Sequence, residues 1–287
     1  NFMGYDRRWL EQVGSEDSHG RAIWGLGEAV NLARSDNIQA AAQSLFENAL
    51  PELVDFSSPR SWAFALAGLH AYLHRFKGDS EVRRTREKLV NRLMRQYLEN
   101  SGKDWPWIED TVNYANGKIS QALIASGRWL NKPDMLEAGL RSLEWLMEIQ
   151  TDPKGHFVPI GNNGWYPRGG EKARFDQQPI EALGMIEACR VAYEATRETK
   201  WLTHAQHCLE WFLGRNDMNA TLYDHQTGGC CDGLGPDGPN RNQGAESTLV
   251  CFLSLLNLHQ LRTRQLSVEA AGQELAESLE EGIYYGK

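Results

Sequence analysis

The sequence has no apolar run of about 18 residues, and this absence excludes a predicted membrane-spanning helix. It also has no cluster of Lys or Arg. The formal net charge is −8 over 287 residues, so a nucleic-acid backbone is not an expected partner. Residues 1–14 contain no apolar core of the kind that export signals need. We therefore expect a cytoplasmic protein with a neutral or cationic ligand.

Cysteine is scarce, and the cysteines form no recognisable framework. Their number is odd, five in 287 residues, so a set of disulfides is not expected. The adjacent pair Cys230–Cys231 follows His225 at a spacing that matches no standard zinc site. Phosphate-binding loops, dinucleotide-binding motifs and Gly-x-Ser-x-Gly motifs are absent as well. We therefore predict neither a metal nor a cofactor.

What the sequence does contain is helical periodicity, and the helical segments come in pairs. The first member of each pair is rich in small and apolar residues, whereas the second has one charged side, as expected for an inner and an outer layer. The pairs are residues 21–33 with 36–52, 61–76 with 80–100, 114–130 with 133–150, 179–196 with 200–213, and 243–261 with 267–281. Residues 2–13 are expected to supply part of a sixth pair. The prediction is an all-α toroid of the (α/α)6 type, forming one domain over residues 1–287.

Two connections are much longer than a helical hairpin needs, residues 151–177 and 215–242. Both are rich in Gly, Pro and aromatic residues, and loops of such length in a compact domain usually bind ligands or close over them. Each precedes the first helix of a pair. We expect both at the end of the toroid where the inner helices begin.

Polar residues of similar kind open four of the predicted inner helices, at residues 16–21, 109–114, 176–181 and 242–247. Capping explains part of this pattern, because Asp, Asn and Ser accept hydrogen bonds from unpaired backbone N–H groups. It does not explain why Glu181 and Glu246 lie a turn inside apolar helices. Parallel inner helices would bring all four segments to one end. We therefore predict a carboxylate-rich cup there.

Paired acids in an aromatic cup are suited to cleave glycosidic bonds, since one carboxyl group protonates the leaving oxygen while the other activates water or attacks the sugar. Asp110 is the best single candidate, because Trp105 and Trp107 precede it as stacking surfaces. The predicted catalytic residues are Asp110, Glu109, Asp176 and Glu246. The predicted substrate-binding residues are Glu16, Asp17, His19, Arg21, Trp105, Trp107, Asn113, Trp165, Arg168, Gln177, Glu181, Asn242 and Gln243.

Three of these segments resemble a known family. Residues 15–21 (SEDSHGR), 104–110 (DWPWIED) and 240–248 (NRNQGAEST) are similar to the helical domain of the six-hairpin glycosidase-like superfamily, found in bacterial polysaccharide-utilisation proteins. The resemblance spans nearly the whole chain and implies an (α/α)6 toroid that acts on an oligosaccharide or polysaccharide. In some relatives this domain follows a glycosyltransferase domain, which implies a glycosyltransferase as a covalent or separate partner. The chain begins with Asn, as a piece of a longer protein would.

The abundance of acids favours a glycoside hydrolase. Two alternatives remain open. One is a non-catalytic glycan-binding or accessory domain of a glycosyltransferase, and the other is a sugar epimerase or polysaccharide lyase. An epimerase or lyase would transfer protons with His or Tyr, and His19, Tyr114 and Tyr166 are placed to do so.

Overall fold

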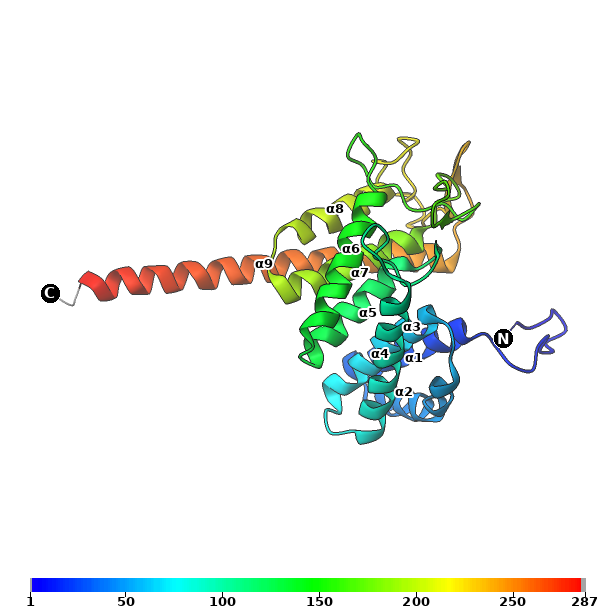
Figure 1. Ribbon diagram of the computed structural model, residues 1–287, viewed down its shortest axis with the longest axis horizontal. Helices are drawn as coiled ribbons and strands as arrows, with labels where there is room; N and C mark the ends of the chain where they lie inside the picture. Colours follow the sequence, from blue (N-terminus) through cyan, green and yellow to red (C-terminus); the bar gives the residue numbers. More distant parts are fainter. Residues whose placement is uncertain (1, 285–287) are drawn as a thin grey trace. The chain divides into compact units, whose positions relative to one another are not determined.

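Helical hairpins follow one another along most of the chain (Figure 1). This computed structural model describes residues 2–284, and the side chains of residues 2–266. The helices are α1 (Glu16–Leu32), α2 (Asp36–Ala49), α3 (Pro59–Arg75), α4 (Ser80–Asn100), α5 (Asn116–Trp129), α6 (Pro133–Ile149), α7 (Pro179–Thr196), α8 (Lys200–Phe212) and α9 (Ala245–Tyr284). The predicted all-α class is confirmed.

The first four hairpins lie where the sequence predicts them, and their ends have ordinary causes. Ser15 caps α1 by accepting a hydrogen bond from the Ser18 N–H at 3.1 Å, and Asp79 caps α4 in the same way. Pro59 and Pro179 open α3 and α7, where the missing N–H of proline costs nothing. The largest difference is at α1, which begins at residue 16 instead of 21 because the polar segment is itself helical.

Two predicted elements differ from the structure. The fifth pair is replaced by the single helix α9, because residues 259–267 contain neither Gly nor Pro to end a helix. The side chains of the predicted helix 267–281 lie outside the described residues. Residues 2–13 form no helix: Met3 and Trp9 form a bridge that closes a turn, in which Arg7 has a φ of 66°.

Contacts divide the chain into two units, which are described separately. Unit 1 comprises Asn1–Ile149 and Asn162–Ala173, and unit 2 comprises Gln150–Gly161 and Arg174–Lys287. Unit 1 contains α1 to α6 and an antiparallel ladder that pairs β1 (Thr111–Val112) with β2 (Tyr166–Pro167). Unit 2 contains α7 to α9 and the hairpin of β3 (Gly233–Gly235) with β4 (Gly238–Asn240).

In unit 1, α1 packs along α3, and glycine makes their approach very close. A Cβ atom on Gly68 would lie 2.2 Å from the carbonyl oxygen of Ile23, and one on Gly27 would lie 2.2 Å from the carbonyl oxygen of Gly68. The two backbones therefore touch at this crossing. Helices α3 and α5 are buried on nearly all sides, whereas α2 and α4 bury one stripe. This difference is the one predicted for inner and outer helices.

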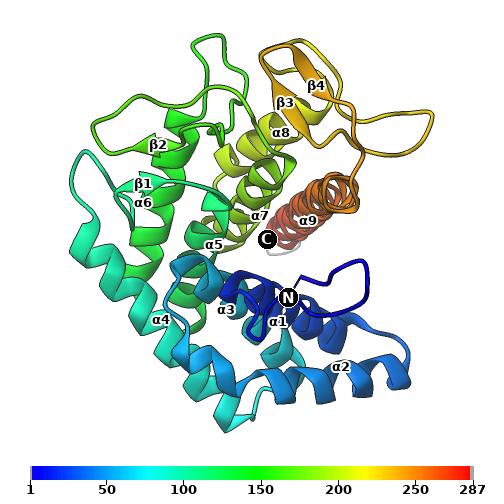
Figure 2. The ribbon, with the colours of Figure 1, turned by 90° about the vertical axis from the view of Figure 1, so that its right-hand side faces the viewer.

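In unit 2, α7 is the central helix and packs against both α8 and α9 (Figure 2). It is buried along nearly its whole length, while α8 buries one side that includes Trp201 and Trp211. Helix α9 buries Val250 and Leu258 but exposes Leu249 and Phe252. Unit 2 therefore repeats the arrangement of a buried first helix covered by an amphipathic second one.

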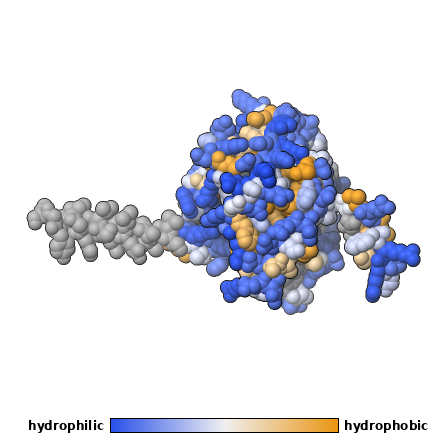
Figure 3. Space-filling view, turned by 90° about the horizontal axis from the view of Figure 1, so that it is seen from below, coloured by the Kyte–Doolittle hydropathy of each residue, from blue (hydrophilic) through white to orange (hydrophobic). Residues whose placement is uncertain are grey.

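The surface is mostly polar where Figure 3 shows it, with scattered apolar patches. Tyr5 and Val13 in the N-terminal segment are among the exposed apolar side chains. In the part of the chain that the structure describes, no helix combines the length and the apolar character needed to cross a membrane.

Candidate functional site

Polar side chains from three elements of unit 1 meet around Tyr114; we call Asp17, Arg21, Arg60, Glu109 and Tyr114 the Tyr114 cluster. Asp17 and Arg21 lie at the start of α1, Arg60 at the start of α3, and the other two in the loop before α5. The Tyr114 hydroxyl donates to Asp17 Oδ1 at 3.2 Å, and Arg21 Nε donates to Asp17 Oδ2 at 2.7 Å. Within unit 1, the start of α1 is thus joined to the loop before α5 through Asp17 and Tyr114.

Arg60 holds the other half of this cluster. Its side chain is 3% exposed and donates to the Tyr114 carbonyl oxygen and to Glu109 Oε2, each at 2.5 Å. A third bond reaches Asn116 Oδ1 at 3.3 Å, and the guanidinium carbon lies 5.0 Å from the centre of the Tyr114 ring. Each carboxylate of the cluster thus has an arginine partner and is partly buried, a setting in which charge-assisted hydrogen bonds are strong.

Tyr114 itself is held in a fixed position. The next residue, Ala115, has a φ of 49°, a left-handed conformation that only a well-determined surrounding maintains outside glycine. Burial raises the pKa of the Tyr114 phenol, and the neighbouring Asp17 carboxylate raises it further, with Arg60 and Arg21 opposing. Near neutral pH the phenol therefore stays protonated, and it serves as a hydrogen-bond donor.

Aromatic rings lie beside the Tyr114 cluster. The half-buried Trp165 ring has its centre 6.4 Å from that of Tyr114. Trp24 stacks on Phe64 at 5.8 Å, and the Lys118 ammonium lies 3.3 Å from the centre of the Trp24 ring. Sequence reasoning missed Arg60, Trp24 and Lys118. No acidic residue marks the start of α3 in the sequence, because this helix begins with Pro-Arg-Ser.

Glu16 and His19 have structural partners in unit 1. Glu16 accepts hydrogen bonds from the N–H groups of Ser57 and Ser58 at 2.9 Å each, which anchors the entry to α3. The His19 ring donates from Nε2 to the Ala49 carbonyl at 2.8 Å. Partial burial raises the pKa of Glu16, but the bonds from Ser58 and Ser57 outweigh it and hold the pKa below the ordinary value of 4.5.

We expect Glu16→Gln to lower the free energy of unfolding by about 1 kcal/mol at pH 7, once solvent exposure is allowed for. Because the folded-state pKa is depressed, this stabilisation is complete above pH 4.5 and is lost as the pH falls through the folded-state value. Urea unfolding of both proteins from pH 7 to pH 3 measures the difference. A difference that stays constant over this range would contradict the assignment.

Trp105 and Trp107, predicted as stacking surfaces for a sugar, belong to the core instead. Trp107 is fully buried and Trp105 is 7% exposed. Both rings pack against Trp145, and Trp105 Nε1 donates to the Glu109 carbonyl at 2.7 Å. Burying two large rings stabilises the segment that leads to β1, and the role of these rings as stacking surfaces stays a prediction. Their contribution to the site is indirect, through the position of Glu109.

Asp110 and Arg168 lie at the surface of unit 1. The Asp110 side chain is 77% exposed and forms an ion pair with Arg168 Nε at 3.4 Å. The Arg168 guanidinium carbon lies 5.4 Å from the centre of the Trp105 ring. Asn113 is half-buried, and its carbonyl accepts from Asn116 Nδ2 at 2.6 Å. Asp110 is therefore accessible to a substrate, but it is more exposed to solvent than Glu109 is.

In unit 2, Asp176 is exposed and has a φ of 62° just before α7. Gln177 follows it and is fully buried. The Gln177 backbone exchanges two hydrogen bonds with Leu234, at 3.0 and 2.9 Å. Its amide accepts from Trp211 Nε1 at 2.7 Å and donates to Asp217 at 2.8 Å. Gln177 therefore fixes the chain next to Asp176 through an amide that is engaged in protein hydrogen bonds, and its substrate-binding role stays a prediction.

Apart from Glu181, the remaining predicted residues of unit 2 lie just before α9 or in its first turn. Asn242 Nδ2 donates to Asp232, and Gln243 Nε2 donates to Asp224 Oδ2 at 2.9 Å. Hydrogen bonds from the Gln226 N–H and from Gln243 lower the pKa of Asp224 to about 2. Asn242 and Gln243 thus hold the loop before α9. Glu181, predicted to bind substrate, is 1% exposed in the first turn of α7, whereas Glu246 is exposed at the start of α9.

Another group of ionisable residues in unit 2 was not predicted. Asp152, His156 and Asp217 have potential ligand atoms within 4.8 Å of one another. Arg174 Nη2 bonds both carboxylates, Asp152 at 2.6 Å and Asp217 at 2.5 Å. The sequence places Asp152 and His156 four residues apart, but nothing in it links them to position 217. His156 and Asp217 also line a cavity of this unit.

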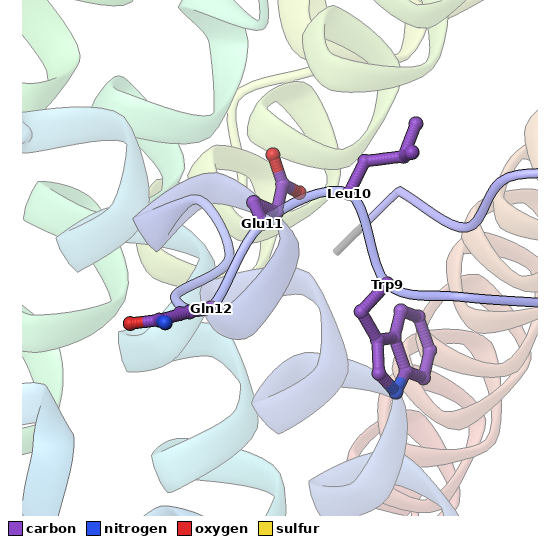
Figure 4. A pocket seen from close by; sticks show the side chains of 4 residues that line it. All are labelled: Trp9, Leu10, Glu11 and Gln12. Atoms are coloured by element: carbon purple, nitrogen blue, oxygen red, sulfur yellow. The ribbon is translucent and has the colours of Figure 1, made fainter.

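A cavity in the N-terminal segment of unit 1 is a poor binding site. Trp9, Leu10, Glu11 and Gln12 line it, and their side chains point in different directions (Figure 4). A binding site needs polar groups that converge on a ligand, and these side chains do not converge.

Comparison with known proteins identifies the fold. No family model and no curated protein matches the sequence. Solved structures do match: an unsaturated glucuronyl hydrolase specific for heparin has 17% identity and a TM-score of 0.60, over 89% of this chain and 70% of that one. A D-mannose isomerase has 11% identity and a TM-score of 0.61, over 86% of this chain and 73% of that one. This chain has the six-hairpin glycosidase fold.

An α-mannanase of family GH76 from Bacteroides thetaiotaomicron shares the six-hairpin glycosidase fold. It has 12% identity and a TM-score of 0.57, over 91% of this chain and 73% of that one. The fold predicted from the resemblance is thereby confirmed. Because the fold hosts several chemistries, the reaction has to be argued from the residues.

Proposed function

We propose that this chain is a carbohydrate-active domain that hydrolyses a glycosidic bond, with the Tyr114 cluster as part of its site. The observation that carries the proposal is the pairing of Asp17 with Arg21 and of Glu109 with Arg60, on either side of a half-buried tyrosine. Carboxylates held in this way are suited to activate water or to stabilise the positive charge that develops on the sugar. The half-buried Trp165 is proposed as the surface on which a sugar ring stacks.

The likeness to carbohydrate enzymes supports this reading. The names of two similar structures are those of a glucuronyl hydrolase and an α-mannanase, and a third is that of a mannose isomerase. All of them cover most of this chain. Asp110, an exposed acid of unit 1, is proposed to protonate the leaving oxygen. Asp176 and Glu246 are exposed acids of unit 2 and stay separate proposals.

The structure offers less support for an epimerase or lyase. Its proton would have to pass through His19 or a tyrosine. The His19 ring already donates to a backbone carbonyl at 2.8 Å. The raised pKa of Tyr114 makes its phenol a poor base near neutral pH. Hydrolysis by carboxylates therefore fits the cluster better than proton abstraction does.

Incubation with a panel of neutral and uronate-containing oligosaccharides, followed by measurement of new reducing ends, tests the proposal. We expect Glu109→Gln and Asp17→Asn each to lower kcat at least about 100-fold, as loss of a catalytic base does. Glu137→Gln, on the exposed side of α6, is the matched control and should leave kcat unchanged.

In Glu109→Gln, Arg60 loses its charged partner, and this loss could destabilise the protein. Circular dichroism melts therefore establish that each variant is folded. Asp17→Asn leaves the Arg60 bonds in place and is the cleaner of the two variants. Turnover that survives both substitutions would rule out this site. Binding of a sugar without turnover on any glycan would instead favour the accessory role.

A further inference from the structure

Unit 2 contains a cavity of about 270 Å³ whose lining is mostly basic. Three segments form it: the loop after α6, the segment before α7 and the loop after α8. The lining residues are Lys154, His156, Arg174, Arg215, Asn216, Asp217 and Asn219. We call it the Lys154 cavity. Three cations and one carboxylate among these residues make an anion the expected occupant.

The acids beneath the cavity are already fully engaged. Asp152 Oδ1 accepts from the Lys154 N–H at 2.9 Å, and Asp152 Oδ2 accepts from Arg174. Asp217 Oδ1 accepts from His156 and Arg174, and Asp217 Oδ2 accepts from Gln177 at 2.8 Å. Hydrogen bonds from the Lys154 N–H and from Arg174 lower the pKa of Asp152. A metal ion at this place would have to displace Arg174 and reorient His156.

The basic groups, in contrast, keep donors for a ligand. Within the described residues, no hydrogen bond or ion pair engages the Lys154 ammonium. Arg174 bonds the two aspartates through Nη2 alone, so its Nε and Nη1 donors remain. Arg215 is oriented by Glu210 at 2.6 Å and by the Gly155 carbonyl at 3.3 Å. The acids thus orient both arginines without using all of their N–H donors.

From this arrangement we propose that the Lys154 cavity binds a tetrahedral oxyanion, a phosphate group, either as the free ion or as a substituent on a sugar. Two guanidinium groups held in place by acids, together with an ammonium group lining the same small space, are the chemistry that recognises such a group. The cavity is smaller than the roughly 300 Å³ at which sites for larger organic ligands begin, so a phosphate or a single phosphorylated sugar fits its scale. The site does not depend on the proposed hydrolysis.

Calorimetric titration of the full chain with sodium phosphate and with sodium sulfate, at constant ionic strength in chloride, tests this site. We expect saturable binding that Lys154→Gln weakens about five- to tenfold, as loss of one charge-assisted bond does. The double variant Lys154→Gln/Arg215→Gln should show no measurable binding. Arg241→Gln, an exposed arginine elsewhere in unit 2, should bind as the parent does. These variants leave the bonds among Asp152, Arg174 and Asp217 intact.

Glucose 6-phosphate separates the two sources of the phosphate group. Affinity more than about tenfold above that of inorganic phosphate would assign a sugar phosphate, and equal affinity would assign the free ion. Absence of saturable binding up to about 10 mM of every anion would overturn the proposal. So would binding that persists in the double variant. A third contrary result is binding of Mn²⁺ or Ca²⁺, lost in Asp217→Asn, without any anion binding.

Discussion

Gly68→Val is expected to lower the free energy of unfolding by about 3 kcal/mol or more, because overpacking against rigid atoms is costly. A Cβ atom at position 68 would lie 2.2 Å from the Ile23 carbonyl oxygen and 2.8 Å from the Trp24 nitrogen. Both are backbone atoms of α1, so no side chain can move aside. The helices would have to separate along the whole crossing, and contacts of Ile23 with α3 would be lost.

Gly25→Ala is the matched control for this prediction. It lies on the exposed side of the same helix α1, and a Cβ atom there would meet nothing within 4 Å. Alanine favours the helix by about 1 kcal/mol over glycine, so this variant should be slightly more stable than the parent. Urea unfolding followed by circular dichroism compares the three proteins. A Gly68→Val protein within about 1 kcal/mol of the parent would show that the helices do not touch there.

The second large effect is expected for Asp217→Ala, at about 3 kcal/mol, because this change removes a buried carboxylate that accepts hydrogen bonds from three donors. The Asp217 side chain is 3% exposed and accepts from His156, Arg174 and Gln177. Gln177 is itself fully buried, so one of its N–H donors would lose its partner without gaining water. Because Gln177 fixes the backbone beneath Asp176, the left-handed conformation of that residue should relax as well.

Hydrogen exchange measures this effect where it arises. Faster exchange in the Asp217→Ala protein is expected in residues 151–161 and 174–178, which the network joins. Asp237→Ala is the control, because it removes an exposed aspartate of unit 2 in the turn between β3 and β4 and breaks no such network. Unchanged exchange in both segments would mean that Asp217 does not connect them.

Much of the helical architecture follows from periodicity, because α3, α5 and α7 are apolar on nearly all sides, whereas the second helix of each pair is apolar on one side. The exception is α9. No Gly or Pro interrupts residues 259–267, and only tertiary contacts could have turned the chain back. The opening segment, expected to supply part of a sixth pair, instead follows local turn hydrogen bonds such as that from the Arg7 N–H to the Gly4 carbonyl.

The sequence predicts which type of residue forms the candidate site, but not the contacts that each residue makes. Acids at helix starts were expected, and Asp17 and Glu109 do lie together with Tyr114. Sequence alone does not reveal the partners of an acid. Glu16 differs from Asp17 because its oxygens reach Ser57, 41 residues away. Likewise, nothing local distinguishes a buried tryptophan such as Trp107 from a half-exposed one such as Trp165.

The two units have a consequence for dissecting the molecule. Each is built from two separate stretches of chain, since residues 162–173 belong to unit 1 and residues 150–161 to unit 2. A truncation after residue 149 would therefore remove β2. This strand pairs with β1, which begins directly after Asp110. No single cut yields either unit whole. Excised halves are thus unsuitable for assigning activity, and point substitutions in the full chain are the appropriate tool.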